Sequence, residues 1–145
     1  MALRYGAFYG PRTGMLSEAM LLDVRRRRFP LIGDGGGWWS FINVDDAATA
    51  TLGAVEKGGV GLYNIVDDDP APVSEWLPAL ASMLGAKPPL HVPKLLARII
   101  AGAHLVVMTT EARADSNAKA KRELSWRLAH PFWQEGFREI LSQAH

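Results

Sequence analysis

The sequence predicts an α/β fold with few short strands and several helices. Strand-like and helical patterns alternate over the first half of the chain, and helical patterns dominate the second half. The 145 residues fit one ordinary domain, and a hydrophobic content of 48% suffices for a core of normal size. No internal repeat, low-complexity tract or domain boundary interrupts the chain.

The chain is predicted to begin with a strand and a helix. Residues 2–5 lean apolar and predict a short strand, and the Gly/Pro-rich residues 6–14 predict a loop after it. Helical spacing predicts a helix over 15–28, which Phe29-Pro30 ends. The apolar positions with this spacing are Met15, Leu16, Ala19, Met20 and Val24.

An aromatic segment and a second helix follow. The glycines of Gly33–Gly37 predict a turn, and the aromatic and β-branched residues 38–44 predict a strand after it. Asp45 or Asp46 is expected to cap a helix that runs to Lys57, because a carboxylate accepts hydrogen bonds from the first free N–H groups of a helix.

The following residues again predict a strand and then a helix. Residues 61–66 predict a strand, and Asp67–Pro70 close it as a turn. Apolar spacing predicts a helix over 74–84, with Gly85 as the residue after its C-terminus. Residues 88–93 predict an extended connection.

Three helices are expected in the last third. Residues 94–107 are apolar on most faces, which favours a core or subunit contact, with a substrate lid or a membrane-surface contact as alternatives. Asp115 or Ser116 is expected to cap a helix that ends near Trp126. Pro131 opens the last helix, over 132–142.

Composition excludes several classes of partner. The net charge of +1 and a pI near 8.1 predict no nucleic-acid partner, so Arg25–Arg28 are interpreted as a solvated helix end. The apolar run over 95–108 is shorter than the roughly 20 residues that a membrane span needs. No signal peptide and no cysteine are present, so we expect a cytoplasmic protein without a membrane partner.

No catalytic or metal-binding constellation is visible. Gly33–Gly37 lack the spacing of a dinucleotide fingerprint, and no Tyr has a Lys four residues later. Asp67–Asp69 are interpreted as a turn rather than a cation site because Pro70 follows them. The histidines stand alone in the sequence, at positions His91, His104, His130 and His145. We therefore expect no catalytic residue and no metal site in this chain.

Three motifs in fixed order resemble one enzyme family. They are Leu3-Arg4-Tyr5-Gly6-Ala7-Phe8-Tyr9-Gly10-Pro11, Trp39-Ser40-Phe41-Ile42-Asn43-Val44-Asp45-Asp46 and Asn117-Ala118-Lys119-Ala120-Lys121-Arg122-Glu123-Leu124-Ser125-Trp126. Together they resemble the C-terminal part of the extended short-chain dehydrogenases/reductases, the NAD(P)-dependent epimerase/dehydratase family. The resemblance implies the C-terminal part of a Rossmann-like NAD(P)-binding fold.

The resemblance also implies a set of site residues. In the family, the loop after the first of these strands passes under the nicotinamide and the substrate. It implies that Tyr5, Gly6 and Phe8 contact the cofactor. The implied substrate-binding residues are Ala7, Phe8, Tyr9, Trp39 and Arg113.

Two departures from the family pattern bear on the substrate. Nucleotide-sugar enzymes of this family hold the diphosphate with an Asn where this chain has Ala7 and with an Arg where it has Trp39. Asn43 also stands where the family has His. Loss of the amide and the guanidinium removes charge-assisted hydrogen bonds to a diphosphate, so a flatter and more apolar substrate is expected.

The implied function is therefore partial. Residues 1–145 are expected to form the substrate-binding portion of an NAD(P)-dependent epimerase/dehydratase or reductase, acting on a sugar-like or small carbonyl or alcohol substrate. The cofactor-binding N-terminal portion is expected to be missing, so the chain alone should be inactive and bind NAD or NADP weakly. The implied partners are a small-molecule substrate and either a second copy or the missing half. The alternative is a non-catalytic binding or oligomerisation module derived from the same family.

Overall fold

The computed structural model describes residues 1–143, within which seven helices and eight short strands form. The mixed α/β class with short strands is confirmed. The chain divides into two compact units, each described by itself: unit 1 holds Met1–Leu16, Ser40–Pro70 and Asp115–His145, and unit 2 holds Ser17–Trp39 and Ala71–Ala114. The sequence showed no boundary because the units interleave, so no linker separates them.

The strands of unit 1 form two parallel pairs. β1 (Ala2–Tyr5) pairs with β6 (Leu62–Ile65), and both strands were predicted. β2 (Ala7–Tyr9) pairs with β5 (Phe41–Asn43), so the prediction of a continuous loop over 6–14 is wrong. A three-residue strand of this kind depends on a partner far along the chain, which local patterns do not reveal.

Gly6 is the point where the chain changes strand partner. Its N–H donates to Ile65 O at 3.1 Å, and the N–H of Ala7 donates to Ser40 O at 2.8 Å. A Cβ on Gly6 would lie 2.5 Å from Ser40 O and 3.1 Å from Cγ1 of Val66. Only glycine therefore allows this close approach of the two strand pairs.

We expect Gly6→Ala to lower the free energy of unfolding by about 1–3 kcal/mol, because the new methyl group meets backbone that cannot move aside. Urea unfolding followed by circular dichroism measures the loss. Gly14→Ala is the matched control, since a Cβ there has no neighbour within 4 Å. Equal stability of the two variants would contradict the steric argument.

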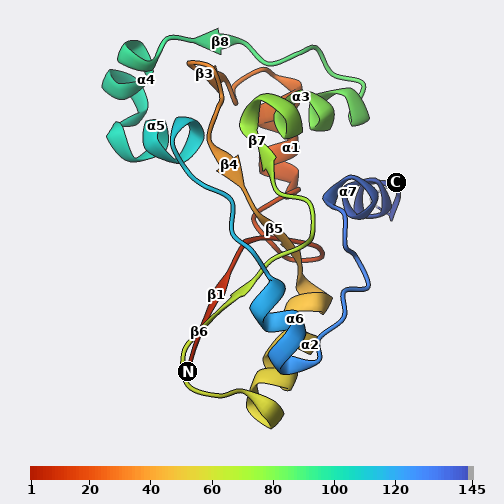
Figure 1. Cartoon of the computed structure of the whole chain (residues 1–145). Coiled ribbons are helices and arrows are strands. Elements are labelled where there is room, and N and C mark those ends of the chain that lie inside the picture. The colour runs from red at the N-terminus through yellow and green to blue at the C-terminus, as the bar shows by residue number, and fades with distance from the viewer. Residues whose placement is uncertain (144–145) are drawn as a thin grey trace. The chain divides into compact units, whose positions relative to one another are not determined.

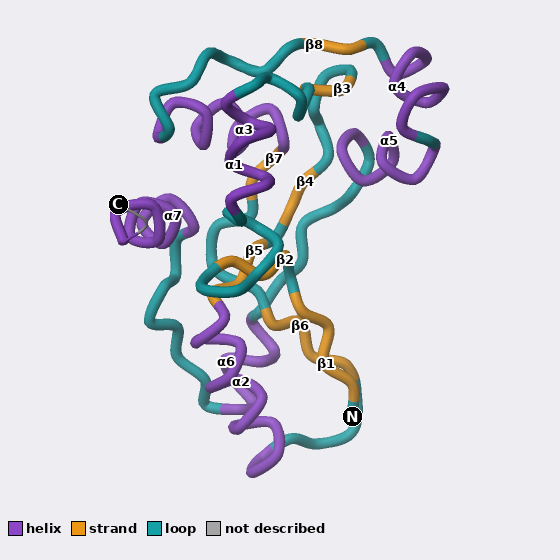
Figure 2. Tube along the Cα trace, turned by 180° about the vertical axis from the view of Figure 1, so that it is seen from behind, coloured by secondary structure: helices purple, strands orange, loops and turns teal. Residues whose placement is uncertain are grey.

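The helices of unit 1 pack on its two strand pairs, β1–β6 and β2–β5. They are α2 (Val44–Lys57), α6 (Ala118–Leu124) and α7 (Trp133–Gln143). Figures 1 and 2 show α6 beside α2. Small residues of α2 pack there against larger side chains in one hydrophobic core. The residues of this core are Ile42, Ala47, Ala50, Ala54, Tyr63, Ile65, Ala120, Leu124 and Trp126. The N-cap of α2 is Asn43, whose side chain accepts from the N–H of Asp45, so the prediction of an aspartate cap is wrong.

Unit 2 contains one parallel and one antiparallel pair of two-residue strands. β3 (Leu31–Ile32) pairs parallel with β8 (His91–Val92), and β4 (Trp38–Trp39) pairs antiparallel with β7 (Ala71–Pro72). The single strand predicted over 38–44 is therefore two strands, β4 and β5, which belong to different units.

The helices of unit 2 are α1 (Glu18–Arg25), α3 (Val73–Met83), α4 (Lys94–Ala101) and α5 (Ala103–Thr110). α1 begins three residues later than predicted because Leu16 has a φ of 64° and Ser17 is the N-cap. The continuous helix predicted over 94–107 is broken at Gly102, whose φ of 90° is incompatible with a helix. α4 and α5 therefore form a hairpin, as both views show (Figures 1 and 2).

Candidate functional site

Two aromatic rings lie together at the junction of β1 and β2. The rings of Tyr5 and Phe8 are 5.2 Å apart between centroids. The Tyr5 oxygen lies 2.6 Å from Thr51 Oγ1, which itself donates to Ala47 O, so the Tyr5 hydroxyl is the donor. Phe8 is 39% exposed. This part of the predicted site thus offers an apolar ring surface rather than a free hydroxyl.

Tyr9 lies on the opposite side of β2 from Phe8 and is fully buried. Its ring packs edge-on to Phe137 of α7 at 5.1 Å, and a Cβ on Gly136 would lie 2.3 Å from its oxygen. Burial raises the pKa of the Tyr9 phenol, and the carboxyls of Asp67 and Asp46 raise it further. Tyr9 is therefore a neutral core residue beneath α7 in this structure.

Trp39 and Arg113 belong to unit 2. The indole N–H of Trp39 donates to Met108 O at 2.8 Å, and its ring lies 5.0 Å from that of Trp76. Trp39 is therefore fixed within its own unit and half-buried. Arg113 is exposed, and no hydrogen bond or ion pair of its side chain occurs among residues 1–143. The predicted contacts of Trp39 and Arg113 with a substrate therefore stay predictions.

A buried carboxyl follows β6 in unit 1. The N–H of Asp67 donates to Phe41 O, and its Oδ1 accepts from the N–H of Asp69 at 3.2 Å. Its Oδ2 is buried without a hydrogen-bond partner. Burial raises the pKa of Asp67 to about 8, and the neighbouring carboxyls of Asp69, Asp68 and Asp46 add to the rise. Asp67 is thus a neutral acid at pH 7.

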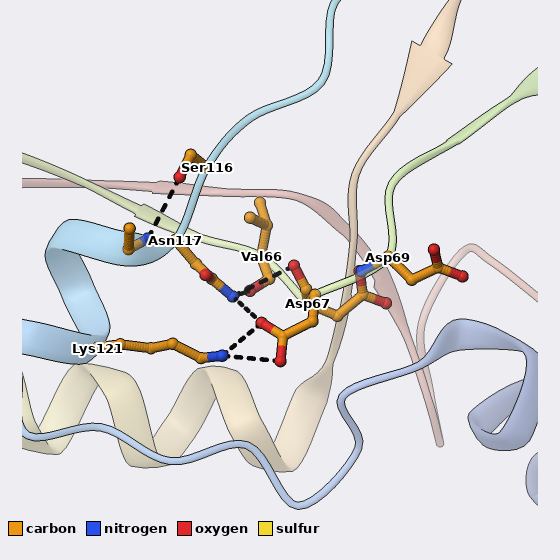
Figure 3. A network of polar contacts seen from close by, with 8 residues as sticks. Val66, Asp67, Asp69, Ser116, Asn117 and Lys121 are labelled. Carbon is orange, nitrogen blue, oxygen red and sulfur yellow. Dashed lines mark hydrogen bonds and ion pairs between the residues drawn. The ribbon is translucent and has the colours of Figure 1, made fainter.

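Asn117 is the centre of a polar network that the sequence analysis missed (Figure 3). Its Nδ2 lies within hydrogen-bond distance of Val66 O (2.9 Å), Asp67 O (3.2 Å) and Asp68 Oδ1 (2.7 Å). Lys121 Nζ donates to both carboxylate oxygens of Asp68, at 2.6 and 2.7 Å. The N-cap position of α6 belongs to Asn117 rather than to Asp115 or Ser116, but the Asn117 side chain makes no capping hydrogen bond. The Ser116 Oγ accepts from the N–H of Ala118 at 3.4 Å, so the predicted position is one residue early while the serine still bonds to the start of the helix.

This network fixes the Asp67–Asp69 connection to α6. Partial burial acts to raise the pKa of Asp68, but hydrogen bonds from Asn117 and Lys121 outweigh it and lower the pKa. The connection is neither helix nor strand, as the turn interpretation requires. Asn followed by Lys four residues later was the available signal, because these positions lie on one face of a helix.

Residues 1–143 hold no group of three or more His, Cys, Asp or Glu side chains able to bind a metal ion. Within the same residues, no helix has the length and apolarity needed to cross a membrane. His145 lies outside the described residues.

Comparison with known proteins finds the same fold in several of them. No protein-family model matches the chain. The chain is 40% identical over 137 residues to the 3-diazoavenalumate denitrifying reductase of a Streptomyces species, covering 94% of this chain and 45% of that protein. It is similar to the human epimerase family protein SDR39U1 (isoform 2), solved with NADPH, with a TM-score of 0.80 and 23% identity over 97% of this chain and 47% of that chain. It is also similar to UDP-glucose 4-epimerase of Thermotoga maritima, solved with UDP-glucose, with a TM-score of 0.71 and 25% identity over 97% of this chain and 44% of that chain.

This chain has the fold of the C-terminal part of an extended short-chain dehydrogenase/reductase. The resemblance found in the three motifs is thereby confirmed. The chain spans about half the length of the relatives that it matches.

Some of the similar structures hold a nicotinamide dinucleotide, as the human protein holds NADPH. Such a group fits the residues of this chain at one end only. The Tyr5–Phe8 ring surface suits an apolar ring. The glycine loop of unit 2 does not suit a diphosphate, because its N–H groups are already used. Gly33, Gly35 and Gly37 donate to backbone carbonyls, and Gly36 donates to the Asp34 side chain. This supports the interpretation of Gly33–Gly37 as a turn.

The third motif, residues 117–126, has a structural role in this fold. Lys119 lies 4.5 Å from the ring centroid of Tyr63, and the Tyr63 hydroxyl donates to Glu123 at 2.8 Å. Trp126 donates its indole N–H to Thr49 of α2 at 3.1 Å. The motif therefore attaches α6 to β6 and α2.

Proposed function

We propose that this chain forms the substrate-side portion of an NAD(P)-dependent reductase or epimerase/dehydratase and is inactive by itself. The similarity to a reductase at 40% identity over 94% of this chain carries the proposal. The occupied N–H groups of the Gly33–Gly37 loop support it, because they leave no diphosphate cradle there. The lack of cysteine is compatible with action in the cytoplasm.

The proposed substrate is a small, flat carbonyl or alcohol compound rather than a nucleotide sugar. Ala7 and Trp39 offer no group that binds a diphosphate, and the exposed Phe8 adds apolar surface. The Streptomyces relative is named for a diazo compound. We assign Ala7, Phe8, Trp39 and Arg113 to substrate contact.

The residues of the β1–β2 junction have distinct proposed roles. Tyr5, Gly6 and Phe8 are assigned to the nicotinamide, which supplies the hydride when it is bound. Because Tyr5 is held by Thr51, its ring rather than its hydroxyl would face the cofactor. Tyr9 is buried, so its proposed contribution to substrate binding is to hold the backbone of β2 against α7.

We expect NADPH to leave the melting temperature of the isolated chain unchanged, because the glycine N–H groups of the Gly33–Gly37 loop are not free for a diphosphate. A ligand present at 1,000 times its Kd would instead stabilise the folded chain by about 4 kcal/mol, which is easily measured. A chimera that joins the unmatched part of the Streptomyces reductase to this chain should instead melt at a higher temperature with NADPH. Differential scanning calorimetry measures both. A large upshift of the isolated chain, or a folded chimera without any upshift, contradicts the proposal.

The exposed side chains of α4 favour the second candidate, a non-catalytic oligomerisation module. Leu96, Ile99 and Ile100 are 47%, 76% and 74% exposed. An apolar face of this kind is typical of a contact surface. Light scattering over a dilution series tests it, and a monomer at all concentrations would exclude it.

A further inference from the structure

The α4–α5 hairpin of unit 2 lines a half-open pocket of about 400 Å³. Its apolar lining comes from Leu95 on α4 and from Ala103, Val106 and Val107 on α5. Val106 is 7% exposed and packs with Ile32 of β3 and Ala97 of α4, which makes the floor part of a packed core. The volume lies within the range of small-molecule pockets, roughly 300–1,000 Å³.

The rim of the pocket carries an uncompensated positive charge. Lys94 and Arg98 stand one helical turn apart on α4, and Glu111 lines the pocket after the end of α5. Lys94 Nζ lies 4.0 Å from Glu111 Oε1. The guanidinium of Arg98 has no hydrogen bond or ion pair within residues 1–143. A guanidinium presents paired donors that match a carboxylate.

We propose that this pocket binds a small apolar carboxylate, with its body on the apolar floor and its carboxylate on Arg98. The site lies wholly within unit 2 and does not depend on the proposed reaction. It uses one side of α4, through Lys94, Leu95 and Arg98. The residues Leu96, Ile99 and Ile100 do not line the pocket.

Sodium cinnamate and its neutral isostere cinnamamide test the site by isothermal titration of the whole chain. Cinnamate should bind about tenfold more tightly, the equivalent of one charge-assisted hydrogen bond. Arg98→Gln should remove this preference and leave cinnamamide binding unchanged. Glu111→Gln should strengthen cinnamate binding, because it removes the competing carboxylate and releases Lys94.

Arg26→Gln is the matched control, because Arg26 is an exposed cation of unit 2 outside the pocket. It should leave both affinities unchanged. All three variants change exposed side chains, so we expect each to remain folded. Unchanged urea unfolding midpoints would show that a change in affinity is not caused by unfolding. The proposal is overturned by equal affinity for cinnamate and cinnamamide, by no binding of either compound, or by weaker cinnamate binding in Glu111→Gln. Concentration-dependent dimerisation that Leu95→Ser abolishes, without cinnamate binding, would assign the hairpin to a second copy instead.

Discussion

The Asp67→Asn variant should be more stable than the wild-type chain at pH 8 and equally stable at pH 4. The folded chain binds the Asp67 proton more tightly than the unfolded chain, since burial raises the pKa from 3.8 to about 8. The wild-type stability is therefore fully present below pH 4 and falls as the pH rises to about 8, by on the order of 5 kcal/mol. Asn has the shape of the protonated carboxyl but does not ionise, so the variant should not lose stability between pH 4 and pH 8. Urea unfolding at pH 4, 6 and 8 measures this loss.

Asp68→Asn is the matched control, because the pKa of Asp68 is shifted in the opposite direction to that of Asp67. Hydrogen bonds from Asn117 and Lys121 lower the pKa of Asp68 despite partial burial. The contribution of the Asp68 carboxylate to the free energy of unfolding is therefore present above its pKa in the unfolded chain. It is lost as the pH falls through its lower pKa in the folded chain. The exposed pair with Lys121 should contribute no more than about 1 kcal/mol. A wild-type stability that stays level from pH 4 to pH 8 would mean that Asp67 is ionised in the folded chain.

The elements predicted correctly are those whose own residues determine their structure. β1 and β6 have strand patterns in their own sequences, and α2 and α3 have helical spacing. β2 and β7 were missed because two or three residues form a strand only through a partner distant in sequence. The break at Gly102 was visible as a glycine, but the apolar pattern on both sides of it favoured one helix.

The strands that carry the candidate site residues were predictable in part, whereas the side-chain contacts were not. The family resemblance located Tyr5–Tyr9 at the carboxyl end of a strand, and the structure has β1 and β2 there. The burial of Tyr9 depends on Gly136 of α7, more than a hundred residues later. The contact of Asn117 with Asp68 likewise joins residues far apart in the chain. Tertiary packing of this kind has no local signal.

The Asp46→Ala variant should lose about 3–5 kcal/mol of unfolding free energy. Asp46 is 2% exposed, and its two carboxylate oxygens accept from the N–H groups of Ala129 and His130 at 2.7 and 2.8 Å. It thereby ties the segment before α7 to the first turn of α2. Alanine removes two hydrogen bonds to a charged acceptor, each typically contributing about 1.5–3 kcal/mol, and leaves the two N–H groups without their acceptor.

Asp45→Ala is the matched control, because Asp45 is the exposed neighbour in the same helical turn. It should lose at most about 1 kcal/mol, the typical interaction of a first-turn carboxylate with the helix dipole. Hydrogen exchange separates the specific tie from a general loss of stability. In Asp46→Ala, the amides of Ala129 and His130 should exchange faster than those of β6 under conditions where the chain remains folded. Uniform acceleration would mean that Asp46 acts through α2 alone, whereas selective acceleration would show that its carboxylate attaches the segment before α7 to α2.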